Sequence, residues 1–234
     1  MLIVWQSVMR ASPSPHRAVS GVVYCGGRGA SCLAATEAPY SRIPMAIEAA
    51  GFPVVDSSLG GGHTWGNDAA LEGIDSAADL LVLRHGCRPD GVLLFAGSMG
   101  VLGALSWASR NRSRVLAVAA TLPVVDIADV HDQDRGGFAS EIETAYGGRQ
   151  GYAHQVAGHN PAALVATLAG LRFKAWYSTN DPIASAPALE AFVDALGPPA
   201  AARSLGPIGH SAGKADPEEI VEHFRRSLDH GQSG

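Results

Sequence analysis

The sequence predicts an α/β fold with a mostly parallel central sheet and helices on both faces. Strand-like and helix-like segments alternate from one end of the 234 residues to the other, as a parallel sheet covered by helices requires. The run 92–96 is apolar at every position, which is typical of a strand buried on both faces. Glycine contributes 28 residues, as expected for a chain in which many short loops join strands to helices.

The first half of the chain divides at clear turn signals. Apolar residues predict strands over 2–8 and 18–24, and Ser-Pro-Ser-Pro at 12–15 forms a turn between them. A short helix is predicted over 41–50 and a strand over 53–58, after which three consecutive glycines open a loop. Within 67–85 a helix with one buried face is predicted by apolar residues that recur every three or four positions: Ala70, Leu71, Ile74, Ala77, Ala78, Leu81 and Val82.

The second half continues the alternation after the strand over 92–96. Small and apolar residues with helical spacing predict a helix that ends near Arg110, and a strand over 115–125 follows, with Pro123 close to its end. Further strands are predicted over 172–177 and 202–205, and further helices over 162–168, 187–196 and 217–228. The segment 127–170 has no clean period, and its acidic run between Asp126 and Glu143 is typical of a solvated face.

Size, charge and cysteine content restrict the class of protein. The length suits a single domain over 1–234, and 47% hydrophobic residues exclude a disordered chain. A net charge of −5 without a cluster of Lys and Arg gives no expectation of nucleic-acid binding. Cys25, Cys32 and Cys87 lack metal-ligand spacing, so neither a metal site nor a disulfide framework is expected.

The lengths of the apolar runs, and the residues before the first of them, bear on where the protein is located. No apolar run reaches the roughly 18 residues that span a bilayer, and no basic region precedes the apolar start of the chain. We therefore expect a cytoplasmic protein that does not associate with membranes. The sequence leaves open whether the chain forms a homo-oligomer.

A reactive serine is indicated where the strand over 92–96 turns into a helix. Ala96-Gly97-Ser98-Met99-Gly100 places a serine between small residues at this junction. Small neighbours are needed there because the serine takes a strained backbone conformation that lifts its hydroxyl clear of the sheet. The pattern resembles the nucleophile elbow of the α/β-hydrolases, Gly-x-Ser-x-Gly, with Ala96 in the place of the first glycine. An ordinary strand-to-helix turn with a capping serine is the alternative.

The resemblance implies a carboxylate and then a histidine downstream of the serine. Asp181 lies just after the predicted strand over 172–177, and His210 lies after the one over 202–205. Ligands of open α/β sheets bind at the carboxyl ends of strands, so Ser98, Asp181 and His210 are expected at one edge. Asp126, after the strand over 115–125, is the alternative acid, because some hydrolases of this fold carry the carboxylate there.

The resemblance also indicates an oxyanion hole and a cap. One amide would come from Met99, the residue after the nucleophile. The loop Cys25-Gly26-Gly27-Arg28-Gly29 resembles the family's His-Gly-x-Gly stretch, with Gly26 in the place of the histidine, and this register favours the Arg28 amide, with Gly27 as the next choice. The segment 127–170 falls where the family places its lid. Three aromatic residues are expected to contact substrate: Trp65, Phe138 and Tyr146.

The predicted function is that of a cofactor-free serine hydrolase, and a carboxylesterase acting on small-molecule esters is favoured. The resemblance implies acyl transfer through a covalent acyl-enzyme. Thioesterase, peptidase, acyltransferase and lipase activities use the same triad and stay open, because this fold carries many chemistries. A non-catalytic binding protein is the alternative from a different class. The presence of all three triad residues favours an enzyme, since a site that has lost its catalytic function has no chemical need for them.

Overall fold

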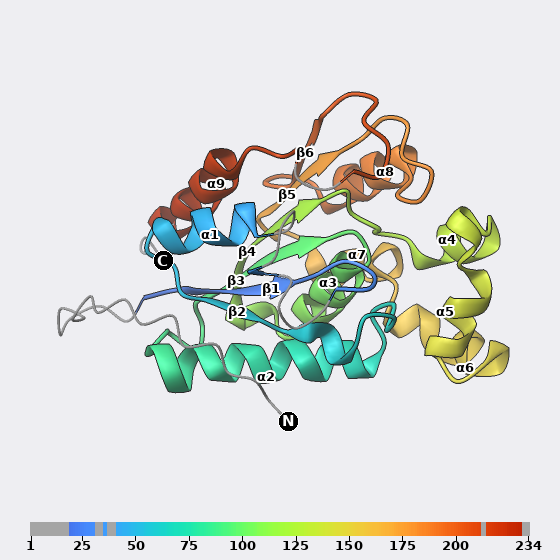
Figure 1. The fold of residues 1–234 in the computed structure, drawn as a ribbon, viewed down its shortest axis with the longest axis horizontal. Coiled ribbons are helices and arrows are strands. Elements are labelled where there is room, and N and C mark those ends of the chain that lie inside the picture. Colours follow the sequence, from blue (N-terminus) through green and yellow to red (C-terminus); the bar gives the residue numbers. More distant parts are fainter. Residues whose placement is uncertain (1–18, 31–34, 37–40, 212–213, 231–234) are drawn as a thin grey trace.

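The computed structural model describes residues 19–30, 35–36, 41–211 and 214–230. Its six strands form one sheet in the order β2-β1-β3-β4-β5-β6, and every neighbouring pair is parallel (Figure 1). The strands are β1 (Gly21–Cys25), β2 (Val54–Asp56), β3 (Val92–Gly97), β4 (Val115–Thr121), β5 (Phe173–Tyr177) and β6 (Ala201–Ser204). Because all strands run the same way, all their carboxyl ends lie at one edge of the sheet. The predicted fold class is confirmed.

Both faces of the sheet are buried, as the continuous apolar run predicted. In β3, Leu94 and Ala96 belong to one hydrophobic cluster, whereas Leu93 and Phe95 belong to the other. The same alternation along β1 and β4 places successive side chains on opposite faces. Among the strands of the described residues, the edge strand β6 is the one exposed along its whole length.

Helices cover the two faces in the layered arrangement that Figure 1 shows. Buried residues of α1 (Arg42–Ala49) and α9 (Pro217–His230) pack on one face, and those of α2 (Asp68–His85), α3 (Gly100–Arg110) and α8 (Ala186–Leu196) pack on the other. Asn67 begins α2 by accepting a hydrogen bond from the Ala70 amide at 3.3 Å. Gly86 ends the same helix with the left-handed conformation that glycine adopts most readily, at φ 65°.

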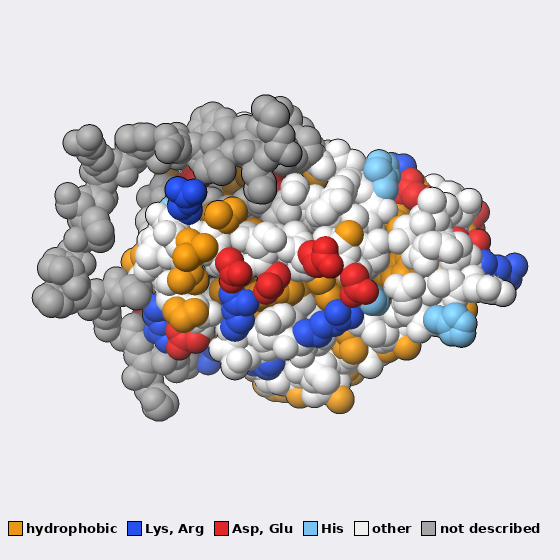
Figure 2. Space-filling view, turned by 90° about the horizontal axis from the view of Figure 1, so that it is seen from below, with side chains coloured by type: hydrophobic (Ala, Val, Ile, Leu, Met, Phe, Trp, Pro, Cys, Tyr) orange, Lys and Arg blue, Asp and Glu red, His pale blue; other side chains and the backbone are white. Residues whose placement is uncertain are grey.

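The outer side of α2 carries charges of both signs. Figure 2 shows acidic and basic side chains next to one another on this face. Arg114 pairs with Asp75 at 3.0 Å and with Asp79 at 3.1 Å, so part of this charge is neutralised locally. Among the helices of the described residues, none combines the length and the hydropathy needed to cross a membrane.

The stretch between β4 and β5 forms a group of short helices. They are α4 (Ile127–Asp132), α5 (Ala139–Ala145), α6 (Arg149–Gln155) and α7 (Val165–Leu168). The first three lie beyond one end of the sheet in Figure 1. The lack of a clean sequence period over 127–170 therefore reflects helices too short to show one. That this segment acts as a cap or lid stays a prediction.

Several predicted bounds differ from the structure. The strand expected over 115–125 ends at Thr121, because Leu122 takes a positive φ of 46° and Pro123 follows it. The helix expected over 162–168 is divided into a 3₁₀ turn and α7 at Leu164. The strand over 2–8 and the turn at 12–15 lie outside the described residues. Five single 3₁₀ turns complete the described elements: Ser58–Gly60, Arg112–Arg114, Arg135–Gly137, Val156–Gly158 and Pro161–Ala163.

Candidate active site

Ser98 lies at a sharp turn between β3 and α3. Its φ of 50° is the left-handed conformation that non-glycine residues rarely take and that the elbow prediction requires. A side chain at Gly100 would meet the carbonyl oxygens of Cys25 and Gly26 at 2.3 Å, so the loop after β1 can approach the elbow only if residue 100 is glycine. Ala96 is fully buried in the core, which shows that the methyl group in place of the first glycine is accommodated.

The structure brings Ser98, His210 and Asp181 into one hydrogen-bonded chain. Ser98 Oγ lies 2.7 Å from His210 Nε2, and His210 Nδ1 lies 2.7 Å from Asp181 Oδ2. A carboxylate opposite Nδ1 holds the proton on that nitrogen, which leaves Nε2 free to accept the Ser98 hydroxyl proton. This is the arrangement of a nucleophile, its general base and the group that orients the base.

The Asp181 carboxylate is buried and fixed on both oxygens. Its side chain is 1% exposed, and Oδ1 accepts the backbone amides of Ile183 at 2.8 Å and Ala184 at 2.9 Å. Burial alone would raise the pKa of Asp181, but the hydrogen bonds from His210 and from these two amides outweigh it and hold the pKa below its usual value. The group therefore stays ionised opposite the imidazole.

Asn180 and Ser178 join the loop that carries Asp181 to the loop that carries His210. Asn180 Oδ1 accepts the Gly209 amide at 2.7 Å, and Ser178 Oγ accepts the Ile208 amide at 3.1 Å. Ser178 also donates to Asn180 at 2.9 Å. These bonds hold the residues just before His210 against the end of β5. Sequence reasoning missed both side chains, although their position directly before Asp181 was a usable signal.

Two backbone segments, the start of α3 and the loop after β1, lie next to Ser98. Met99 immediately precedes the first residue of α3, where helix hydrogen bonding leaves the N–H groups without partners. A Cβ added to Gly27 would lie 3.4 Å from the Ser98 Cβ, so the β1 loop passes directly beside Ser98. Gly27 and Arg28 both line the cavity at Ser98, whereas the Gly27 carbonyl is turned to the Ala30 amide at 3.0 Å. The predicted oxyanion donors are therefore next to the serine.

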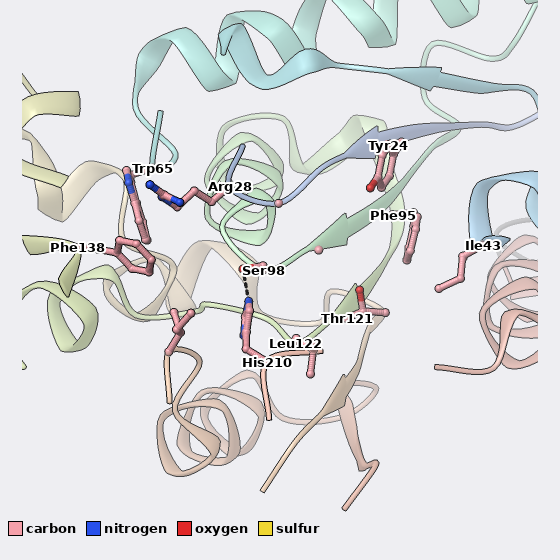
Figure 3. Close-up of a pocket in the computed structure, with 13 residues that line it drawn as sticks. Tyr24, Arg28, Ile43, Trp65, Phe95, Ser98, Thr121, Leu122, Phe138 and His210 are labelled. Carbon is pink, nitrogen blue, oxygen red and sulfur yellow. Dashed lines mark hydrogen bonds between the residues drawn. The ribbon is translucent and has the colours of Figure 1, made fainter. Parts of the chain in front are cut away.

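A cavity of about 270 Å³ opens onto Ser98 and His210. Figure 3 shows Trp65, Arg28 and Phe138 at one end of it and Tyr24, Phe95 and Ile43 at the other, with Ser98 between them. Two of the three predicted contact residues thus lie in its wall. The described residues that line it are mainly apolar or aromatic: Tyr24, Gly27, Arg28, Ile43, Trp65, Phe95, Gly97, Ser98, Thr121, Leu122, Phe138, Ile183 and His210.

In the structure, Tyr146 and Asp126 make contacts other than those expected of a substrate-binding residue and of a triad acid. The Tyr146 side chain is 3% exposed and donates its hydroxyl to the Trp65 carbonyl at 3.0 Å, so it lies behind the cavity wall and supports Trp65. Its expected contact with substrate is corrected on this ground. Asp126 begins α4 by accepting the amides of Ala128 and Asp129 at 3.0 and 3.3 Å. Between the two acids, the one that contacts His210 is Asp181.

Several residues that line the cavity were not predicted from the sequence. Tyr24 and Phe95 belong to strands, where an apolar side chain was expected to be core, and their rings stack at 5.5 Å. Thr121 ends β4 and Leu122 follows it, so the rule that ligands lie at the carboxyl ends of strands was the signal for both residues. In the described part of the chain, no three His, Cys, Asp or Glu side chains are grouped so that they could hold a metal ion.

Comparisons with known proteins give structural likenesses at low sequence identity. No family model matches the chain, and no curated protein matches its sequence. A fluorophosphonate-binding serine hydrolase F from Staphylococcus aureus is 16% identical, with a TM-score of 0.67 over 97% of this chain and 90% of that one. An S-formylglutathione hydrolase from Agrobacterium tumefaciens is 15% identical, with a TM-score of 0.62 over 92% of this chain and 83% of that one.

A puromycin hydrolase is similar over only part of its own length. It is 16% identical, with a TM-score of 0.70 over 92% of this chain and 34% of that one, so the present chain spans about a third of that protein. The parallel sheet, the positive φ at Ser98 and these likenesses agree with one another. The chain has the α/β-hydrolase fold.

Proposed function

We propose that the chain is a serine hydrolase that cleaves carboxylic esters by way of an acyl-enzyme, with a carboxylesterase activity. The single observation that carries the proposal is the continuous hydrogen-bonded chain from Ser98 through His210 to Asp181. It reaches the surface of a cavity that is mainly apolar, which suits the uncharged ends of an ester. The likeness to named serine hydrolases supports the proposal at the level of fold.

Acylation follows from the geometry of the triad. Ser98 Oγ attacks the ester carbonyl carbon while its proton passes to His210 Nε2, and the electron pair of the carbonyl bond moves onto the oxygen. The amides of Met99 and Arg28 stabilise that oxyanion, with the Gly27 amide as the second choice for the latter donor. The tetrahedral intermediate then collapses, and the departing alcohol takes the proton from Nε2. Asp181 stabilises the imidazolium that exists between these two proton transfers.

Deacylation uses the same groups with water in the place of the alcohol. The oxygen of the water molecule attacks the acyl carbon of the ester on Ser98, and at the same time His210 Nε2 accepts a proton from that water. The second tetrahedral intermediate releases the carboxylic acid, and the serine oxygen recovers its proton from His210. The free enzyme is regenerated without a cofactor in any step.

The shape of the cavity supports small to medium substrates. A volume of about 270 Å³ lies just below the range of about 300–1,000 Å³ that is typical of ligand pockets. We propose that Trp65 and Phe138, whose ring centroids are 5.3 Å apart, contact one end of the ester. The other end would lie against Tyr24 and Phe95. Rates on p-nitrophenyl esters should therefore peak at short or medium acyl chains.

The test of the proposal is Ser98→Ala, with Ser109→Ala as the matched control. Ser109 lies in α3 and donates to the Ser106 carbonyl at 2.8 Å, away from the triad. Ser98→Ala should fold normally by circular dichroism and lose p-nitrophenyl butyrate turnover by about 10⁶-fold, the loss seen when a triad nucleophile is removed. Ser109→Ala should keep it. Full activity in Ser98→Ala would eliminate this mechanism.

A substrate panel separates the ester from the related bonds. The solved structures of similar fold include a prolyl endopeptidase and an S-formylglutathione hydrolase, so the panel contains a peptide anilide and a thioester beside the p-nitrophenyl esters. The proposal predicts the highest kcat/KM on esters. A higher value on the anilide or the thioester would keep the triad and reassign the substrate.

A further inference from the structure

One carboxylate in the helical segment after β4 contacts three side chains at the Trp65 end of the cavity. Glu141 of α5 accepts hydrogen bonds from Arg28, with Nε at 2.8 Å from Oε1 and Nη2 at 2.6 Å from Oε2. Trp65 donates from Nε1 to Oε1 at 2.7 Å, and His63 Nδ1 lies 3.1 Å from the same oxygen. Arg28 belongs to the loop after β1 and Trp65 to the loop after β2, so Glu141 joins three segments that are far apart in sequence.

The Arg28 guanidinium contacts an aromatic ring as well as Glu141. It lies 4.7 Å from the centroid of Phe138, whose ring in turn packs against Trp65. Figure 3 shows its side chain extending from the loop after β1 toward Trp65. The bidentate pairing to Glu141 matches the planar fork of a guanidinium, which is also the geometry that binds a substrate carboxylate.

Glu141 keeps its charge over the whole working range of pH. The hydrogen bond from Arg28 is the main cause that lowers the pKa of Glu141 to about 2, against a smaller effect of burial, and those from Trp65 and His63 add to it. The side chains of Arg28 and Glu141 are 39% and 25% exposed, so solvent screens much of the attraction within the pair. The positive charge of Arg28 and the negative charge of Glu141 sum to zero.

We infer that Glu141 determines specificity by occupying Arg28, so that this end of the cavity favours uncharged substrate groups over carboxylates. A substrate carboxylate could pair with Arg28 only by displacing Glu141, which is held in place by its helix and by Trp65. If Glu141 loses its charge, Arg28 becomes a receptor for an anionic group beside Ser98. The inference rests on the proposed function, because it concerns the substrate of that same site.

The experiment compares neutral and anionic esters within each variant. Two matched pairs are used, one in which the acyl chain ends in a methyl group or a carboxylate, and one in which the alcohol part does. Both are needed because either half of the ester can occupy the Trp65 end. The readout is the ratio of kcat/KM for the anionic to the neutral ester, which cancels any general loss of activity in a variant.

Glu141→Gln keeps the shape of the side chain and removes its charge. In one ester pair it should raise the ratio by about tenfold or more, the size of one charge-assisted hydrogen bond. The double variant Arg28→Gln/Glu141→Gln should return the ratio to the wild-type value. Glu143→Gln is the matched control, because Glu143 lies on the same helix and contacts His131 at 3.1 Å instead of the cavity. Its ratio should not change.

Arg28→Gln alone tests the inference by a second route if Glu141→Gln does not fold. It leaves the negative charge of Glu141 without its partner, so the ratio should fall several-fold below that of the wild type. An unchanged ratio in Glu141→Gln, or a rise that persists in the double variant, would overturn the inference. Failure of the proposed function is distinguishable, since the wild type would then hydrolyse neither ester and would not react with a fluorophosphonate probe.

Discussion

Gly100→Ala is expected to damage catalysis through the backbone of the neighbouring loop. The added Cβ would lie 2.3 Å from two carbonyl oxygens, those of Cys25 and Gly26. Ordinary contacts of a Cβ begin near 3.4 Å, so loop and helix must separate by about 1 Å. Gly27 and Arg28, the proposed amide donors, follow these carbonyls directly. The substitution therefore moves the oxyanion donors away from Ser98 without touching a triad side chain.

The size of the effect follows from this displacement. Moving a catalytic group by about 1 Å costs on the order of 10²-fold in rate. Overpacking of this kind also lowers the free energy of unfolding by about 1–3 kcal/mol, while the higher helix propensity of alanine returns up to about 1 kcal/mol. We expect kcat/KM on p-nitrophenyl butyrate to fall about 10²-fold in a protein that remains folded at 25 °C.

Gly103→Ala is the matched control in the same helix. A Cβ there would meet the side chains of Ala70 and Ile74 at 3.4 Å, which is an ordinary van der Waals distance. Its kcat/KM should stay within about twofold of the wild type, and its stability should be equal or higher. Urea denaturation and steady-state kinetics of both variants are the assay. Wild-type activity and stability in Gly100→Ala would refute the argument that the β1 loop rests against the elbow.

Three further predictions concern the acid, the cavity and pH. Asp181→Asn should lower kcat by about 10⁴-fold, as in other serine hydrolases with this triad, and a loss below tenfold in steady-state kinetics would contradict its role. Phe138→Ala should raise KM more than it lowers kcat, and an unchanged KM across an ester series would place substrate elsewhere. Burial is the main cause that lowers the pKa of His223 to about 4 from 6.5, so the unfolded chain binds more protons between these values and stability is lost as the pH falls through them. Urea denaturation should therefore show that wild type loses about 2 kcal/mol more than His223→Gln between pH 7 and 5, and equal losses would refute this reasoning.

The parts of the site that sequence predicted are those fixed by local rules. Small residues around Ser98 indicated the elbow because only a strained turn between strand and helix requires them. Asp181 and His210 were found because each directly follows a strand, and parallel strands deliver such residues to one edge. The structure brings these three side chains together as expected.

The parts that sequence could not predict depend on packing between distant segments. Glu141 was interpreted as one member of a solvated acidic run, because nothing local distinguishes it from Asp132 or Asp134. Its contacts with Arg28 and Trp65 span 113 and 76 positions of sequence. Tyr146 shows the converse, since an aromatic side chain in the right segment lies behind the cavity wall and supports it.

The most direct test of the proposed mechanism is to identify the residue that a fluorophosphonate labels. The wild type should take up one equivalent of the probe, and mass spectrometry of the digested protein should place it on Ser98, because the Ser98 hydroxyl contacts an imidazole held by a buried carboxylate. His210→Ala should react far more slowly, and Ser98→Ala should not react. A folded wild-type protein that stays unlabelled, or that carries the label on a different residue, would contradict the central claim.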